Sequence, residues 1–225
     1  MISIQSLSKS YGKIEVLKNI FLEINEGQVH GIVGRNGAGK TTLFNCLAGI
    51  EQFKGKIEYT EGQLREESAY LQTRPYIMSH ITGHEYLRLV ANAKDIKAMN
   101  EEIVNLFELP LERYAKTYST GMQKKLALTG MLLQQNKVFL LDEPFNGVDL
   151  ESNLIIQALI TRMQRLGKIV LISSHIFQTL QKSCDVIHHL ENGEIARSFS
   201  KAEFDQVEQV LSQKGTSGKI SLLEL

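Results

Sequence analysis

A glycine-rich segment, Gly34–Thr42, constrains the fold of this chain more than any other stretch. It follows a short apolar run, Val29–Val33, that is typical of a β-strand, and it precedes a helix-like run, Leu43–Ala48, that stops at Gly49. Its letters, GRNGAGKTT, fit the pattern G-x-x-x-x-G-K-[ST] in the order strand, loop, helix that this pattern requires. The segment therefore predicts a phosphate-binding loop. The alternative is a glycine-rich turn with a surface lysine.

The residue types explain how such a loop would hold a phosphate. Glycine lets the backbone curl so that successive N–H groups face an anion, and the N-terminus of the next helix adds positive charge. Lys40 would contact the β- and γ-phosphates, and the Thr41 hydroxyl would ligate Mg²⁺. The residues predicted to bind the phosphates of a nucleotide in this loop are Gly34, Arg35, Asn36, Gly37, Ala38, Gly39, Lys40, Thr41 and Thr42.

The composition argues against several classes of protein. The 225 residues carry 25 Lys plus Arg and 25 Asp plus Glu, whereas a nucleic-acid partner usually requires a basic excess. Cys46 and Cys184 are isolated, which predicts neither a metal site nor a disulfide framework. We expect no signal peptide at Met1–Gln5, and no apolar run approaches the ~20 residues of a membrane span. A link to a membrane would therefore go through a partner.

Strand patterns dominate the first third of the chain, on both sides of the glycine loop. The expected strands are Ile2–Leu7, Ile14–Leu17, Ile20–Ile24, Lys54–Tyr59 and Ala69–Gln72, with turns at Lys9–Lys13 and Asn25–Gly27. This distribution predicts an antiparallel layer beside the nucleotide-binding core.

The periodicity becomes helical from Thr82 to about residue 135. The expected helices cover His84–Ala91, Asn100–Phe107 and Gly121–Gln135. Thr82 and Glu85 have the spacing of a capping box at the start of the first helix. We expect a helical subdomain over approximately residues 80–135, inserted between two parts of the core.

Strands and helices alternate after residue 137, which predicts a parallel sheet with helices on its faces. Val138–Leu141 and Lys168–Ile172 have the continuous apolar character of buried parallel strands. Asp185–Ile195 predicts a hairpin around an Asn-Gly turn. The tail, 201–225, is polar, with helical spacing over Ala202–Leu211. Residues 1–225 are expected to form a single α/β domain.

Polar side chains follow the strand-like runs that end near residues 33, 141 and 172. These side chains are Lys40, Asp142, Glu143 and His175. Because ligands bind at the carboxyl ends of parallel strands, we expect all of them near one phosphate. Asp142 would hold Mg²⁺, and Glu143 would orient and polarise the attacking water. The alternatives are an acidic pair that favours a helix N-terminus and an ordinary histidine at a strand end.

These motifs, in this order, resemble the nucleotide-binding subunit of ATP-binding cassette (ABC) transporters over essentially the whole chain. Gly34–Thr42 is similar to the Walker A motif of that family, and Val138–Glu143 is similar to its Walker B motif with the following glutamate. Tyr118–Lys125 resembles the family signature, usually LSGGQ, and Asn146–Asp149 resembles the D-loop. The signature at this spacing separates the family from other proteins with a phosphate loop.

The signature departs from the family pattern at two positions. Thr120 replaces its first glycine and Met122 its glutamine, whereas Ser119 and Gly121 are kept. The version Tyr-Ser-x-Gly-Met resembles the one common in bacterial exporter ATPases.

The remaining motif residues are assigned by their positions in the resemblance. His175 falls at the switch histidine, Tyr11 at the aromatic residue that stacks on adenine, and Asp149 at the aspartate of the D-loop. The metal-ligating glutamine of the family is assigned to Gln72. Counting back from Ile81-Thr82-Gly83 aligns Thr73 with it instead, so both assignments stay open.

The resemblance implies a P-loop NTPase core (ABC ATPase) with an antiparallel β subdomain and an inserted α-helical subdomain. It implies an ATP hydrolase with ATP and Mg²⁺ as cofactors. The residues that the resemblance makes catalytic are Glu143, His175 and Lys40, and those that it makes metal ligands are Thr41, Asp142 and Gln72.

The resemblance also implies partners and a location. Ser119 and Gly121 would contact ATP held by a second copy of the chain, or by a homologous subunit, in a head-to-tail dimer. The dimer would drive transport, in the direction of export, by a separate transmembrane permease subunit at the cytoplasmic face of the cell membrane.

Two other classes of function share the phosphate loop. A non-transport cassette ATPase, acting as a soluble mechanochemical factor, would often show a coiled-coil insertion, tandem cassettes or a basic excess, which this sequence lacks. The other class is a nucleotide kinase or a small GTPase; a GTPase would need an Asn-Lys-x-Asp motif, and the sequence contains none.

Overall fold

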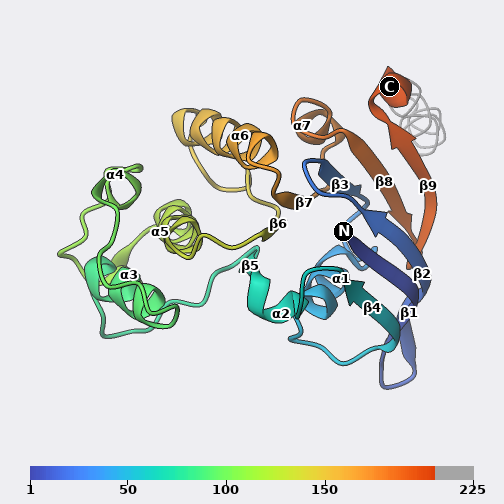
Figure 1. Ribbon diagram of the computed structural model, residues 1–225, viewed down its shortest axis with the longest axis horizontal. Coiled ribbons are helices and arrows are strands. Elements are labelled where there is room, and N and C mark those ends of the chain that lie inside the picture. The colour runs from blue at the N-terminus through green and yellow to red at the C-terminus, as the bar shows by residue number, and fades with distance from the viewer. Residues whose placement is uncertain (206–225) are drawn as a thin grey trace, which may run out of the picture.

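The computed structural model describes residues 1–205, and two β-sheets organise that part of the chain (Figure 1). The smaller sheet is antiparallel, with the strand order β2-β1-β4. Its strands are β1 (Ile2–Tyr11), β2 (Ile14–Ile24) and β4 (Lys54–Tyr59). This is the antiparallel layer that the sequence predicts, and it covers one side of the larger sheet.

The local strand boundaries in the small sheet differ from the prediction. Tyr11 pairs with Ile14, so the turn shrinks to two residues, and Gly12 supplies its left-handed φ of 59°. The strands expected at Ile14–Leu17 and Ile20–Ile24 are one strand, because β2 continues through Asn19 despite a φ of 49° at that residue.

The larger sheet has the order β5-β6-β7-β3-β8-β9 and is parallel except for its last pair. Its strands are β3 (Val29–Val33), β5 (Ser68–Leu71), β6 (Val138–Asp142), β7 (Ile169–Ser174), β8 (Val186–Glu191) and β9 (Glu194–Ser200). Every residue of β3, β6 and β7 is buried, as expected for strands covered on both faces. Val33 pairs with Ser174, and Asp142 pairs with Ser173. The loops that follow these strands therefore emerge side by side at one edge.

The hairpin between β8 and β9 has the predicted Asn-Gly turn. Asn192 has a φ of 52° and Gly193 a φ of 85°, both in the left-handed region that a tight hairpin turn requires. At Gly193 a side chain is excluded as well, because a Cβ atom would lie 2.4 Å from the carbonyl oxygen of Val16. The hairpin thereby packs against β2.

The helices lie on both faces of the large sheet and at one end of the molecule (Figure 1). They are α1 (Lys40–Leu47), α2 (Leu64–Glu67), α3 (Gly83–Asn92), α4 (Glu101–Val104), α5 (Thr120–Leu133), α6 (Leu150–Arg165) and α7 (Phe177–Gln181), with short 3₁₀ turns at Ala115–Thr117 and Lys201–Glu203. The helices α3, α4 and α5 form the end farthest from the antiparallel sheet, where the helical subdomain is predicted.

One predicted helix boundary is confirmed and another is wrong. Thr82 and Glu85 form the reciprocal capping box that the sequence predicts at the start of α3. The helix predicted over Asn100–Phe107 ends at Val104, because Asn105 has left the helical region and Glu108 takes a φ of 48°. The helix predicted over Ala202–Leu211 lies mostly outside the described residues.

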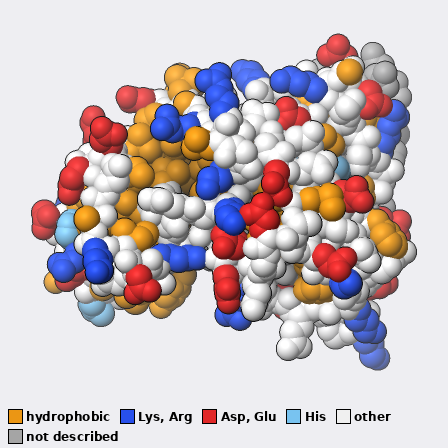
Figure 2. Space-filling view, viewed as in Figure 1, with side chains coloured by type: hydrophobic (Ala, Val, Ile, Leu, Met, Phe, Trp, Pro, Cys, Tyr) orange, Lys and Arg blue, Asp and Glu red, His pale blue; other side chains and the backbone are white. Residues whose placement is uncertain are grey.

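The face of the molecule shown in Figure 2 is mixed in charge and carries an apolar region. Figure 2 shows hydrophobic side chains gathered over α5, between α4 and α6, while charged side chains of both signs are spread over the rest of this face. Within residues 1–205, none of the helices combines the length and the apolar character needed to cross a bilayer.

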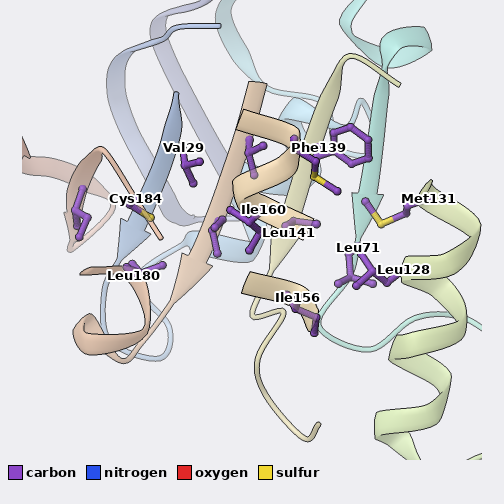
Figure 3. Close-up of a cluster of buried hydrophobic side chains, with 14 of the residues drawn as sticks. Val29, Leu71, Leu128, Met131, Phe139, Leu141, Ile156, Ile160, Leu180 and Cys184 are labelled. Atoms are coloured by element: carbon purple, nitrogen blue, oxygen red, sulfur yellow. The ribbon is translucent and has the colours of Figure 1, made fainter. Parts of the chain in front are cut away.

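Alternating residues of the central strands supply two separate cores. On β6, Phe139 and Leu141 pack toward α5 and α6, whereas Val138 and Leu140 pack toward α1 and the antiparallel sheet. Figure 3 shows the first of these cores, in which Leu128 of α5 lies near Leu71 of β5. Because successive side chains of a strand point to opposite faces, a single buried strand binds both layers together.

Candidate active site

A cleft of about 430 Å³ opens at the carboxyl edge of the large sheet. Its walls come from the glycine loop and from the segments that follow β5, β6 and β7. The lining residues are Val16, Asn36, Gly37, Gly39, Lys40, Thr41, Thr42, Thr73, Glu143, Asn146 and His175. The structure therefore brings Lys40, Glu143 and His175 into one cleft, as the sequence predicts.

The glycines of the loop are required for different physical reasons. Gly37 and Gly39 have φ values of 83° and 108°, which other residues rarely adopt. Gly34 is required by packing, because a Cβ atom there would lie 2.4 Å from the carbonyl oxygen of Leu190. Gly39 also caps α1, and neither a capping side chain nor an acidic residue occupies the first turn of that helix. The first N–H groups of α1 are therefore free to bind an anion.

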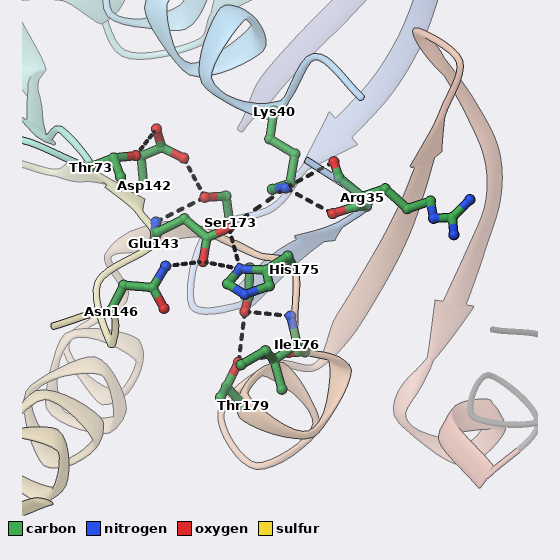
Figure 4. A network of polar contacts seen from close by, with 12 residues as sticks. Arg35, Lys40, Thr73, Asp142, Glu143, Asn146, Ser173, His175, Ile176 and Thr179 are labelled. Carbon is green, nitrogen blue, oxygen red and sulfur yellow. Dashed lines mark hydrogen bonds and ion pairs between the residues drawn. The ribbon is translucent and has the colours of Figure 1, made fainter. Parts of the chain in front are cut away.

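The Lys40 ammonium group lies inside the loop (Figure 4). Its Nζ donates to the carbonyl oxygens of Gly34 at 2.8 Å and Arg35 at 3.3 Å, and it lies 3.6 Å from Oε1 of Glu143. The side chain is only 7% exposed. A buried cation held by carbonyl groups at the centre of an amide-lined loop is well placed to meet a phosphate.

Asp142 ends β6 and is fully buried. Its Oδ2 accepts hydrogen bonds from the hydroxyl groups of Thr41 and Thr73, both at 2.7 Å, and its Oδ1 accepts one from Ser173. Mg²⁺ prefers oxygen ligands from carboxylates and hydroxyl groups, together with substrate phosphates. The oxygens gathered at Asp142 fit a magnesium ion.

The structure places Thr73, and not Gln72, beside Asp142. The Thr73 hydroxyl donates to Asp142, and Thr73 lines both the main cleft and a neighbouring one, whereas Gln72 lines the neighbouring cleft and, within the described residues, is absent from the lining of the main cleft. Counting back from Ile81-Thr82-Gly83 was the sequence signal that indicated Thr73. The assignment of Gln72 as a metal ligand stays a prediction.

Glu143 has a strained backbone and a restrained side chain. Its φ of 52° lies in the left-handed region, which is unusual for a residue other than glycine, and it is only 8% exposed. Nδ1 of His175 lies 3.1 Å from each carboxylate oxygen, and Nδ2 of Asn146 donates to Oε2 at 3.2 Å (Figure 4). The N–H group of Glu143 donates to the hydroxyl of Ser173 at 2.9 Å. The carboxylate is therefore held in one position at the edge of the cleft.

Sequence reasoning missed two of these contacts. It placed Asn146 only within the D-loop, and it gave no role to Ser173. The signal for Asn146 was its spacing of three residues from Glu143, which a tight turn closes. The signal for Ser173 was its place at the carboxyl end of a buried strand, two residues before His175.

The signature residues lie outside the cleft. Ser119 is exposed and caps α5 by accepting a hydrogen bond from the N–H group of Met122 at 3.2 Å. Gly121 lets α5 approach the D-loop, because a Cβ atom there would lie 2.4 Å from the carbonyl oxygen of Gly147. Within the described residues, the lining of the cleft includes neither of them.

The D-loop ends in a helix cap. Asp149 accepts hydrogen bonds from the N–H and hydroxyl groups of Ser152, both at 2.8 Å, at the start of α6. Nζ of Lys125 lies 2.6 Å from its other oxygen. Because Lys125 and these N-terminal donors favour the carboxylate, the pKa of Asp149 is lowered.

Tyr11 lies at the end of β1 and is 43% exposed. Burial raises its pKa, and a hydrogen bond with Thr42 partly offsets this effect. Nζ of Lys9 lies 4.8 Å from the centre of its ring. The ring is thus near the end of the phosphate loop, and its stacking on adenine stays a prediction.

Comparison with known proteins gives a consistent result. A family model described as "ABC transporter" matches residues 17–146. The chain is 31% identical to the ABC-type transporter ATP-binding protein EcsA of Bacillus subtilis, over 87% of this chain and 85% of that protein. It is 30% identical to the methionine import ATP-binding protein MetN of Clostridium tetani, over 98% of this chain and 79% of that protein.

Solved structures show the same fold. A dimeric structure of a post-hydrolysis state of the ATP-binding cassette MJ0796, bound to ADP and Pi, superposes with a TM-score of 0.81. The sequences are 22% identical, and the match covers 89% of this chain and 99% of that one. The predicted α/β architecture is therefore confirmed.

Proposed function

The chain belongs to the ABC transporter family as an ATP-binding, ATP-hydrolysing subunit, and from this premise we propose that it drives export through a separate transmembrane permease subunit. The observation that carries the proposal is the cleft in which the Glu143 carboxylate lies 3.6 Å from Nζ of Lys40 and 3.1 Å from Nδ1 of His175. The signature variant Tyr118–Met122, which resembles that of exporters, supports the direction.

Hydrolysis in this cleft would be phosphoryl transfer to water. The amides of the loop and Lys40 bind the β- and γ-phosphates, and Glu143 accepts a hydrogen bond from the attacking water and orients it. His175 contacts the γ-phosphate and, through its contact with Glu143, holds the carboxylate in line. Thr41 and Asp142 would hold Mg²⁺, which when bound neutralises charge on the phosphate oxygens.

The exposed signature supports a head-to-tail dimer. The N-terminus of α5 offers the Ser119 hydroxyl and unpaired N–H groups, but the cleft of the same chain does not include them. Such a helix terminus favours an anion, and the γ-phosphate of ATP bound by a second copy has the required charge. Each ATP would then be enclosed by the cleft of one copy and the α5 terminus of the other.

A third cleft supports docking of the permease. It lies between the segment that follows β5 and the helices α3 and α5, so it joins the nucleotide core to the helical end. Its lining residues are Tyr70, Gln72, Pro75, Tyr76, Tyr86, Ala127, Gly130, Met131 and Gln134. Tyr76 is 79% exposed, which gives a cytoplasmic helix of the permease an aromatic residue to cover. This arrangement would place the chain at the cytoplasmic face of the cell membrane.

The experiment that tests this proposal is purification of the chain from gently solubilised membranes of its source, with its partners identified by mass. We expect a multi-span membrane protein among the partners. Tyr76→Ala should reduce its recovery, and Ile14→Ala, which changes an exposed residue of the antiparallel sheet, should not. Only soluble partners would contradict the proposal and favour the non-transport cassette ATPase.

The direction of transport needs a separate measurement. Inside-out vesicles that contain the complex should accumulate solute in their lumen when ATP is added, and the Glu143→Gln variant should not. Loss of solute from preloaded vesicles under the same conditions would indicate import, as the name of the methionine relative indicates for that protein.

A further inference from the structure

Lys124 is a buried cation outside the catalytic cleft. It lies in the second turn of α5, and only 1% of it is exposed. No carboxylate oxygen among the described residues lies within ion-pair distance of its Nζ. A buried ammonium group without an ion-pair partner is unfavourable unless polar atoms compensate for the lost water. Packing alone therefore does not explain why a lysine occupies this buried position.

The compensating atoms belong to the turn that carries Glu143. Nζ of Lys124 donates to the carbonyl oxygen of Glu143 at 2.8 Å and to that of Asn146 at 2.7 Å. Burial lowers the pKa of Lys124, and the nearby charges of Glu143 and Asp142 raise it, so the carboxylates favour the charged form. The lysine thus joins the first and last residues of this turn.

This turn needs external support. Glu143 has a φ of 52°. Residues other than glycine rarely adopt this conformation, and it persists only when neighbouring groups restrain it. The N–H group of Asn146 donates to the carbonyl oxygen of Glu143 at 3.2 Å, and that same oxygen accepts the bond from Lys124. Lys124 therefore acts directly on the strained residue.

The restraint extends to the carboxylate. The Asn146 side chain donates to Oε2 of Glu143, so a shift of this turn would move the carboxylate away from His175. Gly121 lies three residues before Lys124 on the same face of α5 and contacts Gly147. The first turns of α5 therefore bond to the Glu143 turn at Lys124 and pack closely on the residue after that turn at Gly121.

We propose that Lys124 is a positioning residue for ATP hydrolysis, which holds Glu143 in the backbone conformation that directs its carboxylate at the attacking water. Lys124 does not contact the substrate. It also ties the helix that begins at the signature to the catalytic turn. The proposal rests on the role of Glu143 that is proposed above.

The first test compares two variants of Lys124 with a control on the same helix. Lys124→Met keeps a side chain of similar length but removes its hydrogen-bond donor. It should lower kcat about 10- to 100-fold, because small misplacements of catalytic groups have effects of this size. The Kd of ATP, measured with a fluorescent analogue on the isolated chain, should change less than twofold. Lys124→Gln keeps a donor of shorter reach and should give an intermediate kcat.

The control separates positioning from simple loss of stability. Leu126 is fully buried on α5 in the core of the helical end, so Leu126→Ala should lower the melting temperature and leave kcat per folded molecule unchanged. If Lys124→Met lowers the melting temperature but leaves kcat unchanged, the proposal is wrong. If the methionine variant does not fold, Lys124→Gln decides, and a kcat equal to that of the unchanged chain would overturn the proposal.

A double-mutant cycle with Glu143→Gln is the sharper test. If Lys124 acts through Glu143, adding Lys124→Met to Glu143→Gln should slow hydrolysis less than twofold further, because residues that act as a unit are not additive. If the fold-losses in hydrolysis rate of the two single variants multiply in the double variant, the proposal is overturned. If Glu143→Gln alone hydrolyses ATP at full rate, the proposed function of Glu143 is wrong, and this outcome is distinct from a failure of Lys124 alone.

Discussion

The two parts of the chain assigned to ATP differ in how much of their geometry is already in place. At the cleft, Lys40, Asp142 and Glu143 are buried and each makes several polar contacts. At the signature, Ser119 is exposed, and among the described residues its hydroxyl accepts a hydrogen bond from its own helix. A phosphate cleft is thus assembled within one chain, whereas the ligand that we propose for the signature would come from a second copy.

The contrast has a physical reason. The cleft stands at the edge of a buried parallel sheet, where strand register places groups from distant segments side by side. The signature is a helix terminus, whose free N–H groups need no partner from the same chain while water reaches them. The following predictions test this division, beginning with the largest expected effect.

Glu143→Gln should separate hydrolysis from binding at the cleft. The amide is similar in size but cannot polarise the attacking water, so we expect the rate of phosphate release to fall about 10²- to 10⁴-fold. ATP binding should remain, and ATP-bound dimers should accumulate in size-exclusion chromatography. Hydrolysis at the parent rate would show that another group orients the water.

Lys40→Ala should remove binding from the cleft itself. Lys40 is the only lysine or arginine that lines the cleft in the described part of the chain. Its loss should weaken ATP affinity about 10- to 100-fold, since a charge-assisted hydrogen bond contributes about 1.5–3 kcal/mol. Titration calorimetry on the isolated chain measures this. The exposed Lys97→Ala provides the control, and equal affinities for the two variants would contradict the assignment.

Ser119→Ala should affect only the assembled site. We expect hydrolysis to fall about tenfold, equivalent to about 1.4 kcal/mol, while ATP binding by the isolated chain is unchanged. The same change removes a helix cap, which alone destabilises a protein by about 1 kcal/mol. Thr82→Ala, which removes the cap of α3, is the matched control for that loss. Weaker ATP binding by isolated Ser119→Ala chains would place the serine at its own cleft instead.

The open choice between Gln72 and Thr73 gives the smallest expected effect. Thr73→Val removes the hydroxyl group from Asp142 and should weaken Mn²⁺ binding in the presence of ATP about threefold or more, as outer contacts of metal sites do. Gln72→Ala should change this affinity less. Electron paramagnetic resonance of bound Mn²⁺ measures both. The opposite order would support Gln72 as the ligand.

Short-range features were predictable because a few neighbouring residues determine them. The strand, loop and helix around Gly34–Thr42, the capping box of Thr82 and the turn at Asn192-Gly193 all follow from local backbone preferences. The end of the helix at Val104 was not predictable in this way. Its apolar spacing continues to Phe107, and the fold overrides that spacing with a left-handed residue at Glu108.

The candidate site also combines features that the sequence predicts with features that it does not. The sequence by itself determined that a phosphate loop, an acidic strand end and a histidine would meet, because parallel strands share one edge. Only the tertiary structure decided that the Thr73 hydroxyl bonds to Asp142, 69 residues away, and that Nζ of Lys124 bonds to the carbonyl oxygen of Glu143, 19 residues away. These contacts depend on the register between strands and on the depth at which α5 packs. No pattern of neighbouring residues encodes such distances, because they arise when separate layers of the fold close on one another.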